Sequence, residues 1–317
     1  MNENKKKYDV ICVGAALVDM AAQVTRHPKS DDEVFVSRLD LLSGGAAANT
    51  AHACAKLGLN SSFLGKIGKE DQFGKKILSD FRKVGIHLDL IKQSNQFGTG
   101  SAYVAVDSQG DRRIYAHSGA ADKLSENDIK SQEISKTKIL YLSSLKNIKP
   151  FIKAGTLAQE HNIPVILNPG MLIVEQGLLK IKRLLRVIDI LIISQREFKT
   201  LMKLTRIDKE NLIEQSQELL NLGIQYIIIT LGEKGAILLN KERFRLFPPY
   251  PVKEVKDTTG AGDAFSTGFI YGINSNYKLI WDNLLRCVKL GNYVASSCIQ
   301  KFGARNGIPV KAQIPKF

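Results

Sequence analysis

The sequence predicts an α/β fold in which a largely parallel sheet is covered by helices. Short runs of apolar and β-branched residues recur without polar alternation, which is typical of strands buried on both faces. Helical patterns stand between many of these runs, and such alternation indicates right-handed crossovers between parallel strands. The expected strands cover residues 10–13, 62–67, 139–142, 164–167, 188–193, 226–231 and 236–239.

Three of the expected helices end at a glycine. Residues 46–57 form an alanine-rich pattern before Gly58, and residues 71–84 and 211–222 are followed by Gly85 and Gly223 in the same way. Glycine adopts the left-handed conformation that commonly closes a helix. These glycines therefore set the predicted helix ends.

Two stretches depart from this rhythm. Residues 33–42 alternate apolar and polar side chains, and residues 99–106 and 112–116 form a pair around the turn signal "DSQGD". Alternation is typical of strands with one solvent-exposed face. The pattern predicts a small antiparallel flap outside the main sheet, with an ordinary edge hairpin as the alternative.

Length and composition favour one globular domain over residues 1–317. The chain is near the upper size that one core supports, and its 44% hydrophobic and 24% charged content is ordinary. The formal net charge of +14 favours anionic ligands. Its basic residues are scattered, without the clustered stripe or reading module of nucleic-acid binders. We expect a nucleotide-sized anion rather than nucleic acid.

The four cysteines indicate a reducing environment. They stand at positions 12, 54, 287 and 298, and none forms a C-x-x-C pair. This spacing predicts reduced thiols that fill the core of a cytoplasmic protein. No apolar run approaches the roughly 18 residues of a membrane span, and no signal-peptide pattern is recognised. We therefore expect no membrane association.

The stretch "DTTGAGDAFSTG", residues 257–268, predicts an anion site. Its glycines place a turn directly before a helix, so the amides of Gly260, Ala261 and Gly262 point outward from the positive end of the helix dipole. Asp263 lies in the first helical turn, where it is either a cap or a base. The stretch is neither a Walker A loop nor a dinucleotide fingerprint.

A second glycine-rich stretch, "SGGAAANTAHACAKLG", covers residues 43–58. Two glycines lead into a helix of small residues, with Asn49 in its first turns. Small residues permit close approach by a ligand or by another backbone. Tight packing of helix on sheet is the alternative explanation.

Together these motifs resemble the ribokinase (PfkB) family of carbohydrate and nucleoside kinases. The two glycine-rich stretches are similar to the two signatures of that family. Four further matches appear in the family's order: "VGAALVD" at 13–19, "LNPG" at 167–170, "TLGEKGA" at 230–236 and "KFGARNGIP" at 301–309. The resemblance implies a three-layer α/β/α fold with a β-stranded lid from about residues 14–43 and 97–118. It also implies transfer of the γ-phosphoryl group of ATP to a hydroxymethyl oxygen.

The resemblance assigns roles to individual residues. Asp263 is implied as the base, beside an anion hole of Gly260, Ala261 and Gly262. The implied substrate-binding residues are Asp19, Gly44, Gly45 and Asn49. The implied nucleotide-binding residues are Ser194, Thr230, Gly232 and Gly262.

Cation sites and a dimer are implied in the same way. Glu197 would organise water around Mg²⁺, although its motif reads "SQRE" and Ser194 replaces the family's asparagine. A potassium site, ligated mostly by backbone oxygens, would involve Asp257, Thr259, Cys298, Lys301 and Gly303. Many relatives form homodimers through the lid, and we expect one here.

Three functions remain open on the sequence. A sugar kinase is the leading hypothesis, a nucleoside kinase of the same family is the second, and a catalytically silent ligand sensor on the same fold is the third. Ser143 and Ser144 stand where ribokinases carry a glutamate, so ribose is open as the substrate. Ser194 mildly favours the sensor, whereas Asp263 and its glycines favour an enzyme.

Overall fold

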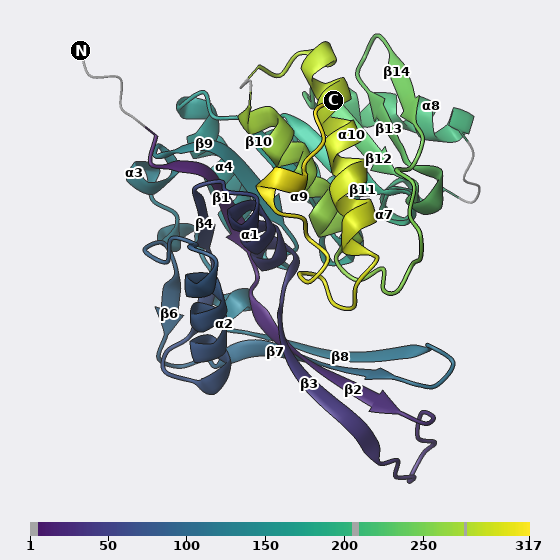
Figure 1. Ribbon diagram of the computed structural model, residues 1–317. Helices are drawn as coiled ribbons and strands as arrows, with labels where there is room; N and C mark the ends of the chain where they lie inside the picture. Colours follow the sequence, from purple (N-terminus) through teal and green to yellow (C-terminus); the bar gives the residue numbers. More distant parts are fainter. Residues whose placement is uncertain (1–5, 205–208, 276–277) are drawn as a thin grey trace.

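A computed structural model of the chain describes residues 6–204, 209–275 and 278–317. Its centre is an eight-stranded sheet with the order β14-β13-β12-β11-β10-β9-β1-β4 (Figure 1). The strands from β4 to β12 in this order pair in parallel, whereas β13 and β14 pair antiparallel at one edge. The bounds are β1 (Tyr8–Gly14), β4 (Ser61–Leu64), β9 (Thr137–Ser143), β10 (Val165–Asn168), β11 (Ile190–Ser194), β12 (Tyr226–Thr230), β13 (Ala236–Leu239) and β14 (Phe244–Phe247).

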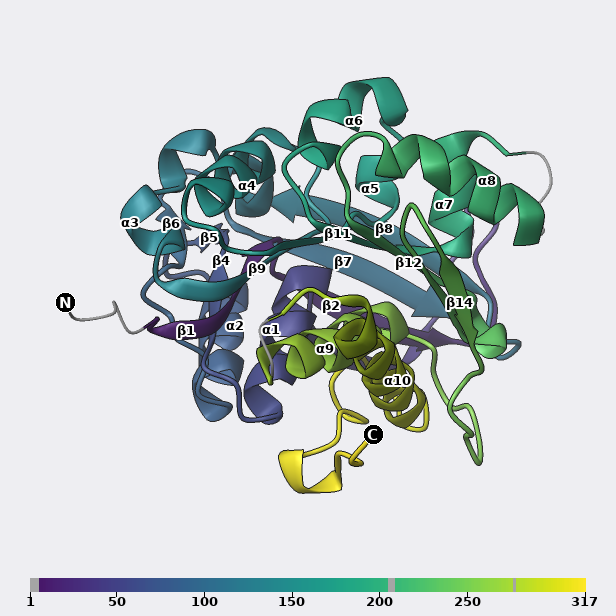
Figure 2. The same ribbon diagram turned by 90° about the horizontal axis from the view of Figure 1, so that it is seen from above.

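Helices cover both faces of this sheet, which gives the three layers that the motifs imply (Figure 2). One face carries α3 (Ser131–Ile134), α4 (Lys149–Glu160), α5 (Met171–Val174), α6 (Leu178–Leu185), α7 (Gln195–Met202) and α8 (Lys209–Leu220). The other face carries α1 (Ala46–Lys56), α2 (Gln72–Lys83), α9 (Ala261–Asn274) and α10 (Trp281–Cys298). The fold class expected from the sequence is confirmed.

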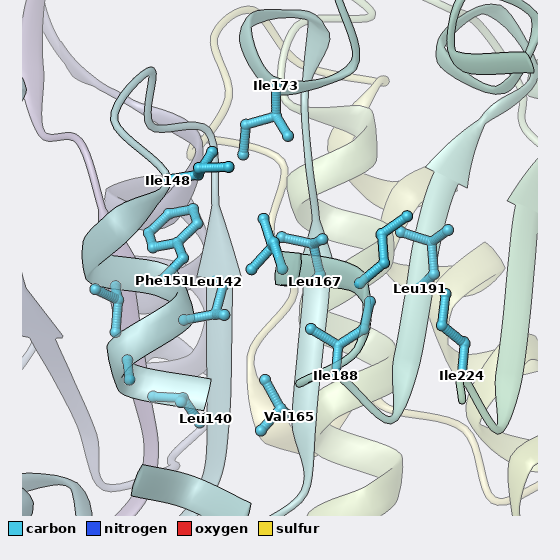
Figure 3. Packing of buried hydrophobic residues seen from close by; sticks show 14 of the residues in the cluster. Leu140, Leu142, Ile148, Phe151, Val165, Leu167, Ile173, Ile188, Leu191 and Ile224 are labelled. Atoms are coloured by element: carbon cyan, nitrogen blue, oxygen red, sulfur yellow. The ribbon is translucent and has the colours of Figure 1, made fainter. Parts of the chain in front are cut away.

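Both faces of the central strands are apolar because each packs on its own helical layer. Leu140, Leu142, Val165 and Leu167 point towards α4, where Phe151 is fully buried (Figure 3). Alternate residues of the same strands join a second core with α1 and α9. Alternating directions with two buried faces explain why the sequence shows continuous apolar runs rather than alternation.

The expected flap is a separate four-stranded sheet with the order β3-β2-β7-β8. It projects from the main body (Figure 1). Its two outer pairs are antiparallel, but β2 and β7 run parallel, so the prediction of an antiparallel flap was incomplete. The strands of this small sheet are β2 (Leu17–Val24), β3 (Val36–Gly44), β7 (Thr99–Val106) and β8 (Arg112–Gly119).

One expected strand is divided. The run predicted at residues 62–67 ends as β4 at Leu64, and after Gly65 the chain forms β5 (Lys66–Gly68), which pairs with β6 (Lys92–Ser94). A Cβ at Gly65 would lie 2.5 Å from the carbonyl oxygen of Gly14. The chain can therefore pass from β4 to β5 at this place only with glycine.

No helix in the described ranges is long and apolar enough to span a membrane.

Candidate active site

A cavity of about 170 Å³ lies where the parallel strands of the central sheet end. Parallel strands present their carboxyl ends at one edge of a sheet, and that edge is the usual binding site of such folds. Ser143, Asn168, Ser194 and Thr230 are the terminal residues of β9, β10, β11 and β12 in turn. The lining residues are Ala46, Ser143, Ser144, Asn168, Gly170, Ile192, Ile193, Ser194, Glu197, Thr230, Gly262 and Asp263.

The glycine-rich turn approaches this cavity at the start of α9. Gly260 caps the helix with φ 77°, and a Cβ there would lie 2.4 Å from the Cβ of Ala304. The amide of Ala261 donates to the carbonyl oxygen of Thr258 at 3.2 Å. The next first-turn amides, those of Gly262 and Asp263, lack a preceding helical turn to accept from them. Gly262 has open space around its Cα, because an added Cβ meets nothing within 4 Å.

Asp263 reaches the cavity from the first turn of α9. Its Oδ2 accepts a hydrogen bond from Nδ2 of Asn49 at 3.0 Å, which joins α9 to α1. Removal from water raises the pKa of Asp263 to about 7, although the bond from Asn49 and the charge of Arg305 lower it. A carboxyl with this pKa is poised to take up a proton near neutral pH.

The implied substrate-binding residues Asp19, Gly44, Gly45 and Asn49 are not among the residues that line this cavity, but they lie together at the start of α1. A Cβ on Gly44 would lie 2.2 Å from Oδ2 of Asp19, so the absence of a side chain makes room for this carboxylate. Gly45 caps α1 with φ 95°, and a Cβ there would meet the carbonyl oxygen of Ala15 at 2.4 Å. Burial raises the pKa of Asp19 to about 6, and the charge of Arg305 opposes that rise.

Ser194 and Glu197 form a capping box at the start of α7. The Oγ of Ser194 accepts from the amide of Glu197 at 3.2 Å, and Oε2 of Glu197 accepts from the amide and hydroxyl of Ser194, both at 2.8 Å. This arrangement is a reciprocal helix cap. It explains why serine is accommodated where the resemblance implies asparagine. Both residues also line the cavity.

The loop after β12 contains the other implied nucleotide contacts. Thr230 lines the cavity, and Gly232 begins a short 3₁₀ turn with φ 62°. A Cβ on Gly232 would meet nothing within 4 Å. The backbone at Gly232 is therefore not covered by other groups, two residues after Thr230 in the cavity wall.

The implied potassium-site residues lie around the Asp257 carboxylate. Oδ1 of Asp257 accepts from the amide and hydroxyl of Thr259, at 2.9 and 2.7 Å, and Oδ2 accepts from the amide of Gly303 at 2.9 Å. The thiol of Cys298 lies 3.8 Å from the carbonyl oxygen of Thr259. Lys301 is exposed, and its amide donates to the carbonyl oxygen of Cys298 at 3.3 Å. These residues lie close to one another in the structure.

Arg112 of the small sheet also contacts this carboxylate, which the sequence analysis did not anticipate. Its guanidinium donates to Oδ1 of Asp257 at 3.1 Å and to the hydroxyl of Thr259 at 3.0 Å. Burial raises the pKa of Asp257, but the bonds from Thr259 and Gly303 and the charge of Arg112 lower it overall. Arg112 thus connects the small sheet to the loop before residues 260–262, which we call the anion turn.

Three residues that line the cavity were not assigned to the site from the sequence. Ser143 and Ser144 were noted only as replacements of a family glutamate, and Asn168 only as part of the "LNPG" motif. Nδ2 of Asn168 donates to the hydroxyl of Ser266 at 3.2 Å. Polar residues directly after buried parallel strands were the available signal, because those strand ends share one edge. Arg305 was also given no role from the sequence, although its Nε donates to Oδ1 of Asn49 at 2.9 Å.

Comparisons with known proteins identify the family of the chain and its fold. A family model described as "pfkB family carbohydrate kinase" matches residues 7–311. An uncharacterized sugar kinase of Archaeoglobus fulgidus is 30% identical over 257 residues, covering 80% of this chain and 97% of that protein. Ribokinase of Staphylococcus aureus is 27% identical over 308 residues, covering 96% of this chain and 98% of its own.

The fold has a solved counterpart. The structure of Arabidopsis thaliana ribokinase complexed with ribose and ATP has a TM-score of 0.87 to this one at 26% identity, and the match covers 97% of each chain. The family model spans the motifs from which the resemblance was inferred, so that inference is confirmed. The chain belongs to the pfkB family of carbohydrate kinases.

Proposed function

We propose that this protein transfers the γ-phosphoryl group of ATP to a hydroxymethyl group of a sugar, with Asp263 as the catalytic base. One observation carries the proposal: Asp263, with a pKa of about 7, projects into the strand-end cavity from the N-terminus of α9. The carboxylate and the adjacent amides supply both requirements of phosphoryl transfer, which are an oriented nucleophile and stabilised charge.

The proton moves from the sugar hydroxyl to Asp263 as the oxygen–phosphorus bond forms. An ionised carboxylate accepts this proton, so activity requires the deprotonated form. Because the pKa of Asp263 is raised to about 7, kcat/KM is expected to fall as pH drops through about 7. The bond from Asn49 holds Oδ2, which leaves Oδ1 to face the acceptor.

The anion turn stabilises the charge that develops on the transferred group. Gly262 lines the cavity in the first turn of α9, where unpaired amides and the positive end of the helix dipole are available to an anion. The open space at Gly262 admits a phosphoryl oxygen close to the backbone. These groups are positioned before substrate binds, which is the main contribution a protein makes to this reaction.

The residues present fit a Mg²⁺ ion that is bound mainly by the nucleotide phosphates, rather than one surrounded by protein ligands. In the parts of the chain that the structure describes, no three His, Cys, Asp or Glu residues are grouped so that they could hold a metal ion. Mg²⁺ usually binds through one or two carboxylates together with phosphate oxygens and water. Glu197, which lines the cavity and whose Oε2 accepts from Ser194, is the residue that would hold the ion, through water. When bound, the ion neutralises charge on the phosphates.

The proposed sugar site combines hydroxyl-binding groups. Asp19 lies against Gly44, the amide of Asn49 donates to the carbonyl oxygen of Gly45 at 2.8 Å, and Ser143, Ser144 and Asn168 line the cavity. Carboxylate, amide and hydroxyl groups pair well with a polyhydroxylated acceptor. A coupled assay of ADP formation from MgATP tests the proposal on pentoses, hexoses, sugar phosphates and nucleosides. Sugar-dependent turnover supports it, turnover on nucleosides alone would make the protein a nucleoside kinase, and none with any acceptor would favour a ligand sensor.

Arg112 bears on the proposed potassium dependence. Oδ1 of Asp257 already accepts three protein hydrogen bonds, whereas Oδ2 accepts one and has room for a cation. The positive charge of Arg112 opposes a cation bound at that carboxylate.

Replacement of Arg112 by alanine is therefore expected to increase stimulation of turnover by KCl about two- to fivefold, the scale of one exposed ion pair. Titration with KCl against tetramethylammonium chloride measures the change. The matched control is Arg183→Ala, which removes an exposed arginine from α6 rather than from the small sheet. Equal stimulation of both variants would contradict the role given to Arg112.

We also propose that the small sheet is a homodimer interface. Its exposed apolar side chains include Leu39, Leu41 and Tyr115, which are 55%, 47% and 69% exposed and which the cross-strand register places on one face. An apolar patch of this kind marks an interaction surface, and a second copy of the same sheet would bury it.

Replacement of Leu39 by aspartate is expected to convert a dimer into monomers and to raise the sugar KM, because charge at the centre of an apolar interface is costly. Light scattering coupled to size exclusion measures the mass. Leu179→Asp, an 89%-exposed leucine on α6, is the control. A monomeric wild-type protein would refute the interface.

A further inference from the structure

Arg305 links the C-terminal segment to the residue that holds the proposed base. It follows α10 in the segment 299–309, and its Nε donates to Oδ1 of Asn49 at 2.9 Å. The guanidinium lies 5.9 Å from the centroid of the Phe81 ring, and Nη2 is buried without a hydrogen-bond partner. The charge is thus held inside the fold next to α1 and α2.

The chemistry of arginine determines how the Asn49 amide is oriented. A guanidinium has only donors, whereas an asparagine amide has an oxygen acceptor at one end and an NH₂ donor at the other. Because Arg305 occupies Oδ1, the amide must present Nδ2 to Oδ2 of Asp263, as observed at 3.0 Å. An NH₂ donor favours the ionised carboxylate, which is an acceptor only.

We propose that Arg305 is a positioning residue for the phosphoryl-transfer reaction: it fixes the Asn49 amide so that Asn49 orients Asp263 and keeps it ionised. The inference rests on the proposed function of Asp263 as the base. Arg305 acts through Asn49 and across 256 residues of sequence, so no local motif reveals it.

The charges around Asp263 agree with this role. Burial raises its pKa most, the Asn49 bond and the charge of Arg305 lower it, and the charge of Glu197 on α7 raises it. Tyr141 of β9 and Cys298 of α10 also face the carboxylate, and burial raises the pKa of both, so they stay neutral. Loss of Arg305 therefore raises the pKa of Asp263.

The charges around Arg305 define the pH range of a test. Burial lowers its pKa to about 10, while Asp80, Asp263 and Asp19 raise it, so it stays charged below pH 9. Burial also lowers the pKa of His52 to about 4, which leaves it neutral above pH 6. Burial raises the pKa of Asp19 to about 6, so the pH at which the titration of Asp263 ends is compared between pH 6.5 and 9, where these neighbours keep their charge state.

The first measurement needs no substrate. The free energy of unfolding is measured from pH 4 to 9 for the wild type and for Asp263→Asn, and their difference reports ionisation of Asp263. A raised folded pKa means that the native state holds the extra proton, so the stability due to Asp263 declines with rising pH and levels off near pH 7. In the Arg305→Gln background this levelling is expected about one pH unit higher, the scale of a nearby opposite charge.

The second measurement is kinetic, with MgATP and the acceptor that turns over in the panel. In Arg305→Gln the acid limb of kcat/KM is expected to move up by about one pH unit, with kcat lowered and the ATP KM unchanged. Arg82→Gln is the matched control, because it removes an exposed positive charge from α2 beside Phe81. A merely structural role for Arg305 would leave the acid limb where it is.

Each outcome decides the proposal. An unshifted pKa in Arg305→Gln, with turnover still lost in Asp263→Asn, overturns the role of Arg305 and leaves the base in place. Full turnover by Asp263→Asn overturns the proposed base itself. Arg305→Met, which keeps side-chain length without a buried charge, replaces a glutamine variant that does not fold. If neither variant folds, Arg305 is structural and the proposal fails.

Discussion

Replacement of Asp263 by asparagine is expected to lower kcat by about 10³-fold while leaving the Kd for MgATP within about twofold of the wild type. General-base catalysis contributes about 10²–10⁴-fold, and asparagine keeps the shape of the side chain without a basic site. The amides at the start of α9 remain in place, so the nucleotide keeps its contacts.

The same substitution is expected to stabilise the fold at pH 8. Removal from water raises the pKa of Asp263 to about 7, so the ionised carboxylate is disfavoured in the native state. Above that pKa the charge costs stability, and a neutral amide removes the cost, by about 1–2 kcal/mol after allowance for partial solvent access. Below about pH 4 the protonated acid and the amide are expected to be equally stable.

Activity and stability should therefore change in opposite directions in this variant. ADP formation measures kcat, calorimetric titration measures the Kd of MgATP, and urea unfolding at pH 8 and pH 4 measures stability. Near-wild-type turnover would remove Asp263 as the base. The cap role that the sequence allowed for Asp263 does not hold, because Gly260 is the N-cap of α9 and no side-chain cap bond is present there. Loss of both turnover and stability would instead make the bond between Asp263 and Asn49 structural.

Substitution of Gly262 by alanine is also expected to change activity and stability in opposite directions. A Cβ at Gly262 meets nothing within 4 Å, and the residue lines the cavity. Alanine is expected to stabilise α9 by about 0.5–1 kcal/mol, because glycine is the poorer helix former. The added methyl group occupies the space that a phosphoryl oxygen needs, so kcat is expected to fall about 10-fold for alanine and about 10²-fold or more for valine.

Gly223→Ala is the matched control for this series. Its Cβ also meets nothing within 4 Å, but Gly223 has φ 113° at the end of α8, away from the cavity. Alanine there is expected to lower stability and to leave kcat unchanged. Normal turnover by Gly262→Val would show that the glycine serves only the backbone turn.

The order of strands and helices was predictable because its signals are local. Continuous apolar runs indicate strands buried on both faces, and Gly58, Gly85 and Gly223 all have the positive φ that closes a helix. The anion turn was visible for the same reason, since glycines and a helix start are adjacent in the chain. The fourth strand of the small sheet, β2, lies within the lid implied at residues 14–43, but no pattern marked it as a strand. Its parallel pairing with β7 joins segments far apart in sequence.

The active-site contacts depended on tertiary structure. Asn49 and Asp263 are 214 residues apart, and Arg305 reaches Asn49 across 256 residues, so no spacing rule relates them. From the sequence, Ser194 is only a replacement of the family's asparagine, whereas the structure shows that it forms a complete capping box with Glu197. Backbone conformation follows from side chains a few residues away, but the partner of a carboxylate and its pKa follow from whichever distant groups the packed layers bring beside it.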